Sequence, residues 1–186
     1  DFHLTADSIL AYSVTWKDRT IIQNSVLGFK LSDNTCVAAN VEIEKITETA
    51  SDTVWKPVYG EQSQYRDNYN EMLVNFSKGS KLYALRIRAY NEGVAFRYEF
   101  NQLDSMKIAD ELTEFTFADN QTVWVSKKAQ SVVTEMKLDQ VSFDCERPFI
   151  ANISDSVFLA LGEAGLVDFA RMKFRYIPGA GNRLKA

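Results

Sequence analysis

The stretch LRIRAYNEGVAFRYEF, residues 85–100, decides the fold class. Apolar and polar side chains alternate through residues 85–90 and again through residues 94–100. A period of two residues is typical of half-buried antiparallel strands, because successive side chains point to opposite faces of a sheet. The intervening residues 91–93 predict a three-residue hairpin loop, in which Gly93 takes a positive φ.

Similar segments recur along most of the chain. Further strands are expected in ILAYSVTW (9–16), SVLGFKL (25–31), VEIEKITE (41–48), EMLVNFS (71–77), LTEFTF (112–117), TVWVS (122–126), SVVTEMKL (131–138), FIANI (149–153), VFLALGEA (157–164) and MKFRYI (172–177). No long stretch shows a strong period of about 3.6 residues, which amphipathic helices require. The pattern predicts an all-β sandwich or barrel. No composition shift, repeat or linker marks a domain boundary, so residues 1–186 are expected to form one domain.

Composition and charge exclude some classes of function. The 186 residues are 46% hydrophobic and 25% charged, which is ordinary for a soluble globular protein. A net charge of −4 provides no overall basic field, so nucleic-acid binding is disfavoured. No apolar run approaches the ~20 residues of a membrane span. The first residues, DFHLTADSIL, indicate a mature or trimmed N-terminus from which an export signal could have been removed.

Histidine and cysteine are scarce, which limits the chemistry open to this chain. His3 is the only histidine, so a nucleophile–histidine pair has almost no candidate base and a histidine-rich metal site is excluded. Cys36 and Cys145 allow one disulfide or two free thiols, and no CxxC motif occurs. Carboxylates are therefore the expected participants in any reaction.

Two regions carry candidate site residues. The segment WKPVYGEQSQYRDNYNEM (55–72) combines aromatic and charged residues, and Trp55, Tyr59 and Glu61 are candidate sugar contacts on a carbohydrate-binding or interdomain surface. The alternative is a long connection whose aromatic rings close the end of a sandwich. The acidic residues of ADELTEF (109–115) have three interpretations: a glycosidase pair, a set of metal ligands or, more commonly, the solvated edge of a strand or turn.

A single carboxylate, Glu163, interrupts the small and apolar residues of SVFLALGEAGLVDFARM (156–172). Such a glutamate either lies exposed where a strand ends or is held by a group that compensates its charge. The residues of this segment alone leave both alternatives open.

Several segments, in this order, resemble the N-terminal domain of glycoside hydrolase family 97: WKPVYGE, YNEMLVNF, IRAYNEGVAFRYEF, ELTEFTF and GEAGLVDFARM. Members are bacterial α-glucosidases and α-galactosidases. The resemblance implies a galactose-mutarotase-like (supersandwich) β-sandwich, followed in the family by a catalytic (β/α)8 barrel and a small β domain. Residues 1–186 would then be an N-terminal domain, incomplete at its C-terminal end, of an exported enzyme, periplasmic in a Bacteroides-like bacterium.

The resemblance also implies a role for Glu163. Family members hold a calcium ion mostly with barrel glutamates, and the N-terminal domain lends one ligand from a segment that matches GEAGLVDF. The matching carboxylate is Glu163, preceded by Gly162 where the family often has histidine. Calcium takes about 6–8 oxygen ligands, so Glu163 in this chain alone is expected to bind it weakly or not at all. The catalytic carboxylates would lie in the barrel, and the isolated chain should be inactive on oligosaccharides.

Two other functions remain open on the sequence. A stand-alone carbohydrate-binding module is supported by the β pattern and the aromatic residues around Trp55. A structural domain with an interaction surface over residues 55–72 fits the same features. A mutarotase-like enzyme is disfavoured, because it would use a histidine and His3 is the only one. If a barrel packs against this chain, an exposed apolar face is expected where it packs.

Overall fold

The computed structural model describes residues 2–4, 9–100, 106–167 and 169–186. Within these residues it contains sixteen β-strands and one short 3-10 helix, η1 (Leu138–Gln140), which confirms the all-β prediction. The chain divides into two compact units, the first made of residues 1–39 and 107–186 and the second of residues 40–106. That residues 1–186 form one domain of a longer enzyme stays a prediction. In the described part of the chain, no helix is long and apolar enough to cross a membrane.

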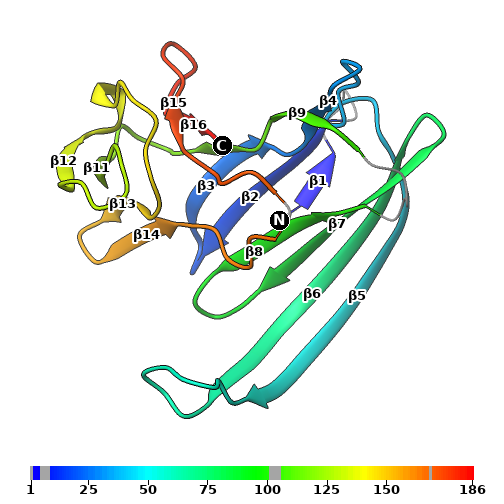
Figure 1. Cartoon of the computed structure of the whole chain (residues 1–186), viewed down its shortest axis with the longest axis horizontal. Coiled ribbons are helices and arrows are strands. Elements are labelled where there is room, and N and C mark those ends of the chain that lie inside the picture. The colour runs from blue at the N-terminus through cyan, green and yellow to red at the C-terminus, as the bar shows by residue number, and fades with distance from the viewer. Residues whose placement is uncertain (1, 5–8, 101–105, 168) are drawn as a thin grey trace. The chain divides into compact units, whose positions relative to one another are not determined.

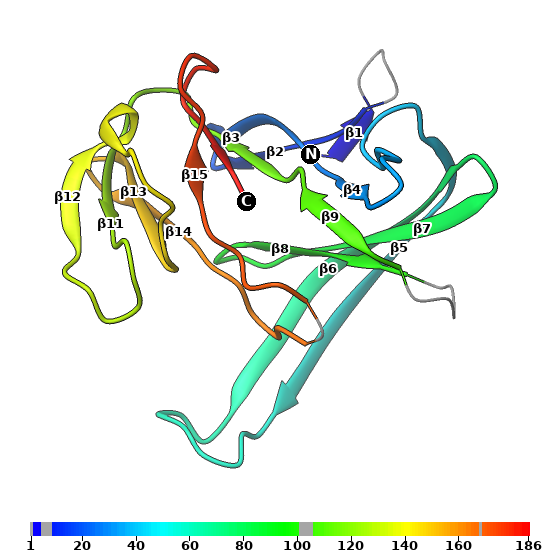
Figure 2. The same cartoon turned by 45° about the horizontal axis from the view of Figure 1, so that its top comes forward.

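The first unit consists of antiparallel sheets (Figures 1 and 2). A six-stranded sheet has the order β1 (Phe2–Leu4), β2 (Leu10–Trp16), β3 (Arg19–Val26), β10 (Glu114–Thr116), β16 (Arg183–Lys185) and β15 (Arg175–Tyr176). A four-stranded sheet has the order β12 (Thr134–Lys137), β11 (Thr122–Val125), β13 (Phe149–Ser154) and β14 (Val157–Leu161), and β4 (Phe29–Leu31) pairs with β9 (Ile108–Glu111). Both views show β15 between the four-stranded sheet and β2–β3.

An aromatic cluster forms the core of the first unit. Phe174 is fully buried, and its ring centroid lies 5.6 Å from that of Phe115 in β10 and 5.8 Å from that of Phe149 in β13. Tyr12 and Phe117 extend the cluster at its two ends. These contacts join residues of the six-stranded sheet to residues of the four-stranded sheet. The burial of large rings is a major source of stability in such a core.

The second unit is a four-stranded antiparallel sheet in chain order, made of β5 (Glu42–Trp55), β6 (Tyr65–Lys78), β7 (Lys81–Ala89) and β8 (Val94–Glu99). The predicted hairpin over residues 85–100 is confirmed, with Arg86 opposite Arg97. Its three-residue loop is wrong, because Ala89 pairs with Val94 and residues 90–93 form the connection. The expectation that Gly93 has a positive φ is wrong, because its φ is not positive. Its carbonyl oxygen instead closes the loop by accepting the Tyr90 N–H at 2.8 Å.

Two further expectations need correction in detail, and the alternative left open for the cysteines is decided. The strands expected at residues 41–48 and 71–77 are parts of the much longer β5 and β6. The outer half of β5 is largely exposed, and that of β6 alternates between half-buried and exposed residues. The strand expected at 25–31 is broken at Gly28 (φ 147°), where a Cβ would approach the Ala38 Cβ to 2.5 Å. Cys36 and Cys145 are both free thiols, and burial raises the pKa of Cys145 to about 12.

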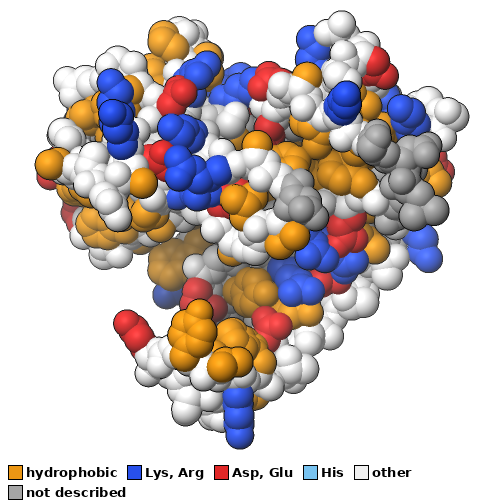
Figure 3. Space-filling view, viewed as in Figure 1, with side chains coloured by type: hydrophobic (Ala, Val, Ile, Leu, Met, Phe, Trp, Pro, Cys, Tyr) orange, Lys and Arg blue, Asp and Glu red, His pale blue; other side chains and the backbone are white. Residues whose placement is uncertain are grey.

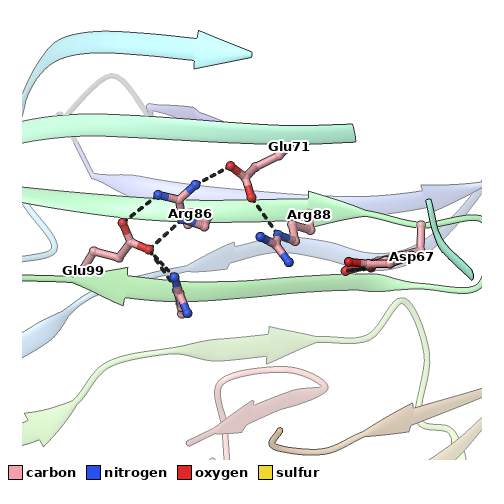
Figure 4. A network of polar contacts seen from close by, with 7 residues as sticks. Asp67, Glu71, Arg86, Arg88 and Glu99 are labelled. Atoms are coloured by element: carbon pink, nitrogen blue, oxygen red, sulfur yellow. Dashed lines mark hydrogen bonds and ion pairs between the residues drawn. The ribbon is translucent and has the colours of Figure 1, made fainter. Parts of the chain in front are cut away.

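Alternating charges line one face of β6, β7 and β8 (Figure 4). Arg86 pairs with Glu71 on one side and with Glu99 on the other, where its Nε lies 2.6 Å from the Glu99 carboxylate. Arg88 donates to the second oxygen of Glu71 at 2.7 Å, and Arg97 donates to Glu99. Burial raises the pKa of Glu71, but the hydrogen bonds and charges of Arg88 and Arg86 outweigh it and leave the pKa below its usual value. Arg86, as hydrogen-bond donor, is also the main cause of the lowered pKa of Glu99.

Replacing Arg86 with methionine should lower the free energy of unfolding by about 1–3 kcal/mol at pH 7, because it removes charged hydrogen bonds from two mostly buried carboxylates. Both carboxyl groups have a pKa below the unfolded value of about 4.3. Their contribution is therefore complete above that value and is lost as the pH falls through the lower folded pKa. Urea unfolding measures the free energy of unfolding of Arg86→Met and of the wild type at both pH values. The difference between the two proteins should be smaller at pH 3 than at pH 7.

Arg66→Met provides the matched control, because Arg66 pairs with Asp52 on an exposed part of the hairpin. This substitution should leave the free energy of unfolding almost unchanged. Equal losses of stability in the two variants would show that the network of Arg86 has no special role.

Candidate functional site

Glu163 lies in the connection that follows β14, two residues after the strand ends at Leu161. The strand expected to continue through residue 164 therefore stops earlier. The Glu163 side chain is only 13% exposed, although Gly162 before it and the residues after it are exposed. A half-buried carboxylate outside a strand needs partners that offset its desolvation.

Two partners supply that compensation. The Arg147 guanidinium forms an ion pair with Oε2 of Glu163, and the Met172 backbone N–H donates to the same oxygen at 3.2 Å. Oε1 of Glu163 accepts no hydrogen bond from the residues that the structure describes. Of the two alternatives open on the sequence, the structure thus shows the second, a glutamate held by a compensating charge.

Further ion pairs hold together the two segments that contact Glu163. The backbones of Cys145 and Phe174 exchange hydrogen bonds of 2.7 and 3.0 Å. On either side of this bridge, Glu146 accepts from Arg171 at 2.7 Å, and Asp144 accepts two bonds from Arg175 at 2.7 and 2.9 Å. Arg175 lowers the pKa of Asp144 through these hydrogen bonds. Residues 144–147 and 171–175, which we call the ion-pair ladder, therefore form a cross-linked support for Glu163.

The sequence reasoning missed Arg147, although a signal for the ladder was present. In DCER (144–147), acids stand at positions 144 and 146, and in RMKFR (171–175) bases stand at 171, 173 and 175. Opposite charges at the same period of two are typical of paired extended segments. The pairing of Arg147 with Glu163 has no comparable spacing, because Glu163 lies in an irregular connection.

The described residues contain no group of three or more His, Cys, Asp or Glu side chains that could hold a metal ion. Glu163 nevertheless fits the role of a single contributed ligand, since Oε2 makes the closest contact with Arg147 and accepts the Met172 N–H, whereas no described residue donates a hydrogen bond to Oε1. Calcium prefers carboxylate oxygens and needs several of them. Among the described residues, Glu163 alone is thus too few ligands for calcium. Asp168 of the same segment lies outside the described residues.

The three candidate sugar contacts lie at the end of the β5–β6 hairpin, where hydrophobic side chains gather (Figure 3). Trp55 is 52% exposed and stacks on Tyr65, with ring centroids 5.1 Å apart. Tyr59 is 89% exposed, and Glu61 is also exposed. Trp55 thus helps to hold the hairpin end, whereas Tyr59 is available to a partner.

The acidic residues of the segment 109–115 each have a partner of their own. Asp110 pairs with Lys185, and Glu114 pairs with Arg183 at 3.2 Å. Glu111 accepts a hydrogen bond from the Thr113 hydroxyl at 2.8 Å, and burial raises its pKa. These contacts favour a structural role for all three carboxylates.

The comparisons with known proteins agree with this fold. The family model described as glycosyl-hydrolase 97 N-terminal matches residues 1–185. A retaining alpha-galactosidase from Bacteroides thetaiotaomicron is 23% identical over 122 residues, which are 66% of this chain and 18% of the relative. This chain therefore spans about a fifth of the length of that curated relative.

Two solved structures of a glycoside hydrolase family 97 enzyme from Pseudoalteromonas sp. strain K8 are also similar. The complex with acarbose is 27% identical, with a TM-score of 0.88 over 98% of this chain and 29% of that one. The complex with panose is 25% identical, with a TM-score of 0.86 over 100% of this chain and 31% of that one. Because the family model matches residues 1–185, the chain belongs to the family of N-terminal domains found in glycoside hydrolase family 97.

Proposed function

We propose that this chain is the N-terminal domain of a calcium-dependent family 97 α-glycosidase that hydrolyses α-glucosides or α-galactosides. The observation that carries the proposal is the family match over residues 1–185. The retaining alpha-galactosidase and the enzyme solved with panose and acarbose support this substrate class. The enzyme would be exported and periplasmic.

In this proposal the chain contributes one metal ligand and one wall of the cleft. Glu163 would lend a carboxylate oxygen to calcium, and barrel carboxylates of the same polypeptide would complete the site. The metal, when bound, supplies positive charge that polarises groups at the scissile bond. The catalytic acid and its partner carboxylate would lie in the barrel, so residues 1–186 alone would be inactive.

Exposed apolar residues beside Glu163 support a contact with the barrel. Leu166 is 43% exposed, Val167 is 75% exposed and Phe169 is 39% exposed, all within six residues of Glu163. Neighbouring apolar side chains that face solvent often mark an interaction site. This connection is the part of the chain that we expect the barrel to cover.

The test uses the longer protein that carries this chain. It should hydrolyse an aryl α-glucoside or an aryl α-galactoside, lose most of that activity after treatment with a chelator, and regain it with calcium. Full activity without calcium would contradict the metal part of the proposal. A native protein that ends near Ala186 and binds oligosaccharides without hydrolysing them would support the carbohydrate-binding module instead.

The hairpin end would add a substrate contact. Trp55, Tyr59 and Glu61 are exposed, and an exposed tyrosine ring can pack against a sugar. Tyr59→Ala should leave the free energy of unfolding within about 0.5 kcal/mol of the wild type, because its side chain is almost wholly solvated. The Michaelis constant for a long oligosaccharide should rise, while that for a small aryl glycoside stays unchanged. Unchanged kinetics with both substrates would remove the hairpin end from the substrate site.

A further inference from the structure

The two oxygens of the Glu163 carboxylate have different surroundings. The Arg147 guanidinium and the Met172 N–H both contact Oε2. No described residue donates to Oε1. A carboxylate held through one oxygen has a defined orientation and presents its other oxygen in a fixed direction.

Arg147 comes from a firmly held part of the fold. Its neighbour Glu146 is 5% exposed, donates its N–H to the Ser126 carbonyl at 2.8 Å and pairs with Arg171 and Lys173. Two residues on, Phe149 is fully buried and begins β13. Glu163, by contrast, lies in a connection without strand pairing. Arg147 is therefore the fixed member of the pair, and Glu163 is the member that is oriented by it.

We propose that Arg147 is a positioning residue that anchors Oε2 of Glu163 and thereby presents Oε1 to the calcium ion. This inference rests on the proposed function, in which Glu163 is a metal ligand. It adds that the two carboxylate oxygens have different partners, Arg147 for Oε2 and the metal for Oε1. Groups that hydrogen-bond a metal-ligating side chain typically change metal affinity by about 10–100-fold when they are replaced.

Electrostatic repulsion acts in the opposite direction. The guanidinium of Arg147 carries a positive charge and repels a nearby cation, so its removal alone would strengthen calcium binding. Positioning and repulsion therefore predict opposite signs for the same substitution. The direction of the change in calcium affinity decides between them.

The experiment is a calorimetric titration of calcium into the metal-free, longer protein that carries this chain. Arg147→Gln is compared with the wild type, with Glu163→Gln and with Arg175→Gln. Arg175→Gln breaks the exposed ion pair with Asp144 in the same ladder and leaves Glu163 with its partners. Thermal unfolding of each metal-free variant reports on the fold independently of calcium. Should Arg147→Gln fail to fold, Arg147→Lys keeps the charge and is titrated instead.

Arg147→Gln is expected to weaken calcium binding by about tenfold, with Arg175→Gln within about twofold of the wild type. Arg147→Lys should also weaken it, by a smaller factor. Unchanged or tighter binding in the Arg147 variant, together with a loss in Glu163→Gln, would overturn the positioning role alone. No loss in Glu163→Gln would overturn the proposed metal role of Glu163 and the positioning role with it.

Discussion

Glu163→Gln in the longer protein is expected to weaken calcium binding by at least about tenfold and to lower kcat/KM at limiting calcium. Glutamine keeps the size of the side chain and one carbonyl oxygen but removes the negative charge that calcium prefers. It also leaves Arg147 without its carboxylate partner. Saturating calcium should restore part of the activity, because the substitution acts through the metal. Calorimetry and steady-state kinetics over a calcium series measure both effects.

Glu146→Gln is the control for general damage to the ion-pair ladder. Glu146 is at least as buried as Glu163 and pairs with Arg171 and Lys173, yet it has no part in the proposed metal site. It should lower the free energy of unfolding and weaken calcium binding less than Glu163→Gln does, because Glu146 supports Glu163 only through the ladder. Equal losses of calcium affinity in the two variants would indicate that Glu163 acts only through the fold.

Phe174→Ala is expected to lower the free energy of unfolding by about 3–5 kcal/mol. Phe174 is fully buried and contacts the rings of Phe115 and Phe149, so its removal leaves a cavity between residues of two sheets. Its backbone also pairs with Cys145 in the ladder that supports Glu163. Urea unfolding of the purified chain, followed by tryptophan fluorescence, measures the loss.

Phe158→Ala is the matched control in the same unit. Phe158 is 59% exposed and contacts only the ring of Trp124 among the aromatic pairs of the described residues. Its replacement should lower the free energy of unfolding by about 1 kcal/mol or less. A loss for Phe174→Ala no larger than that of Phe158→Ala would contradict the assignment of the core.

The strands could be predicted because their signal is local. Alternation in residues 85–100 reflects one apolar, mostly half-buried face, and the structure places Arg86, Arg97 and Glu99 together on the other. The outer half of β5 could not be predicted, because both of its faces are largely exposed and give no alternation. The division into two compact units has no counterpart in the sequence, where no shift in composition marks a boundary.

The candidate site could be predicted only in part, for a different physical reason. Glu163 stands out in an apolar segment, and the family resemblance assigned it a role. Its partner Arg147 is sixteen residues away, across a hairpin and an irregular connection, and no periodicity joins the two. The contact of the Met172 N–H is also invisible in a sequence, because every residue except proline has such a donor.

The most direct test of the account is a crystal structure of the longer protein grown with calcium, in which the distance from Glu163 to the metal is measured. Oε1 is expected to lie about 2.3–2.6 Å from the ion, with Oε2 still paired to Arg147. A calcium site completed without Glu163, with both of its oxygens remote from the ion, would contradict it.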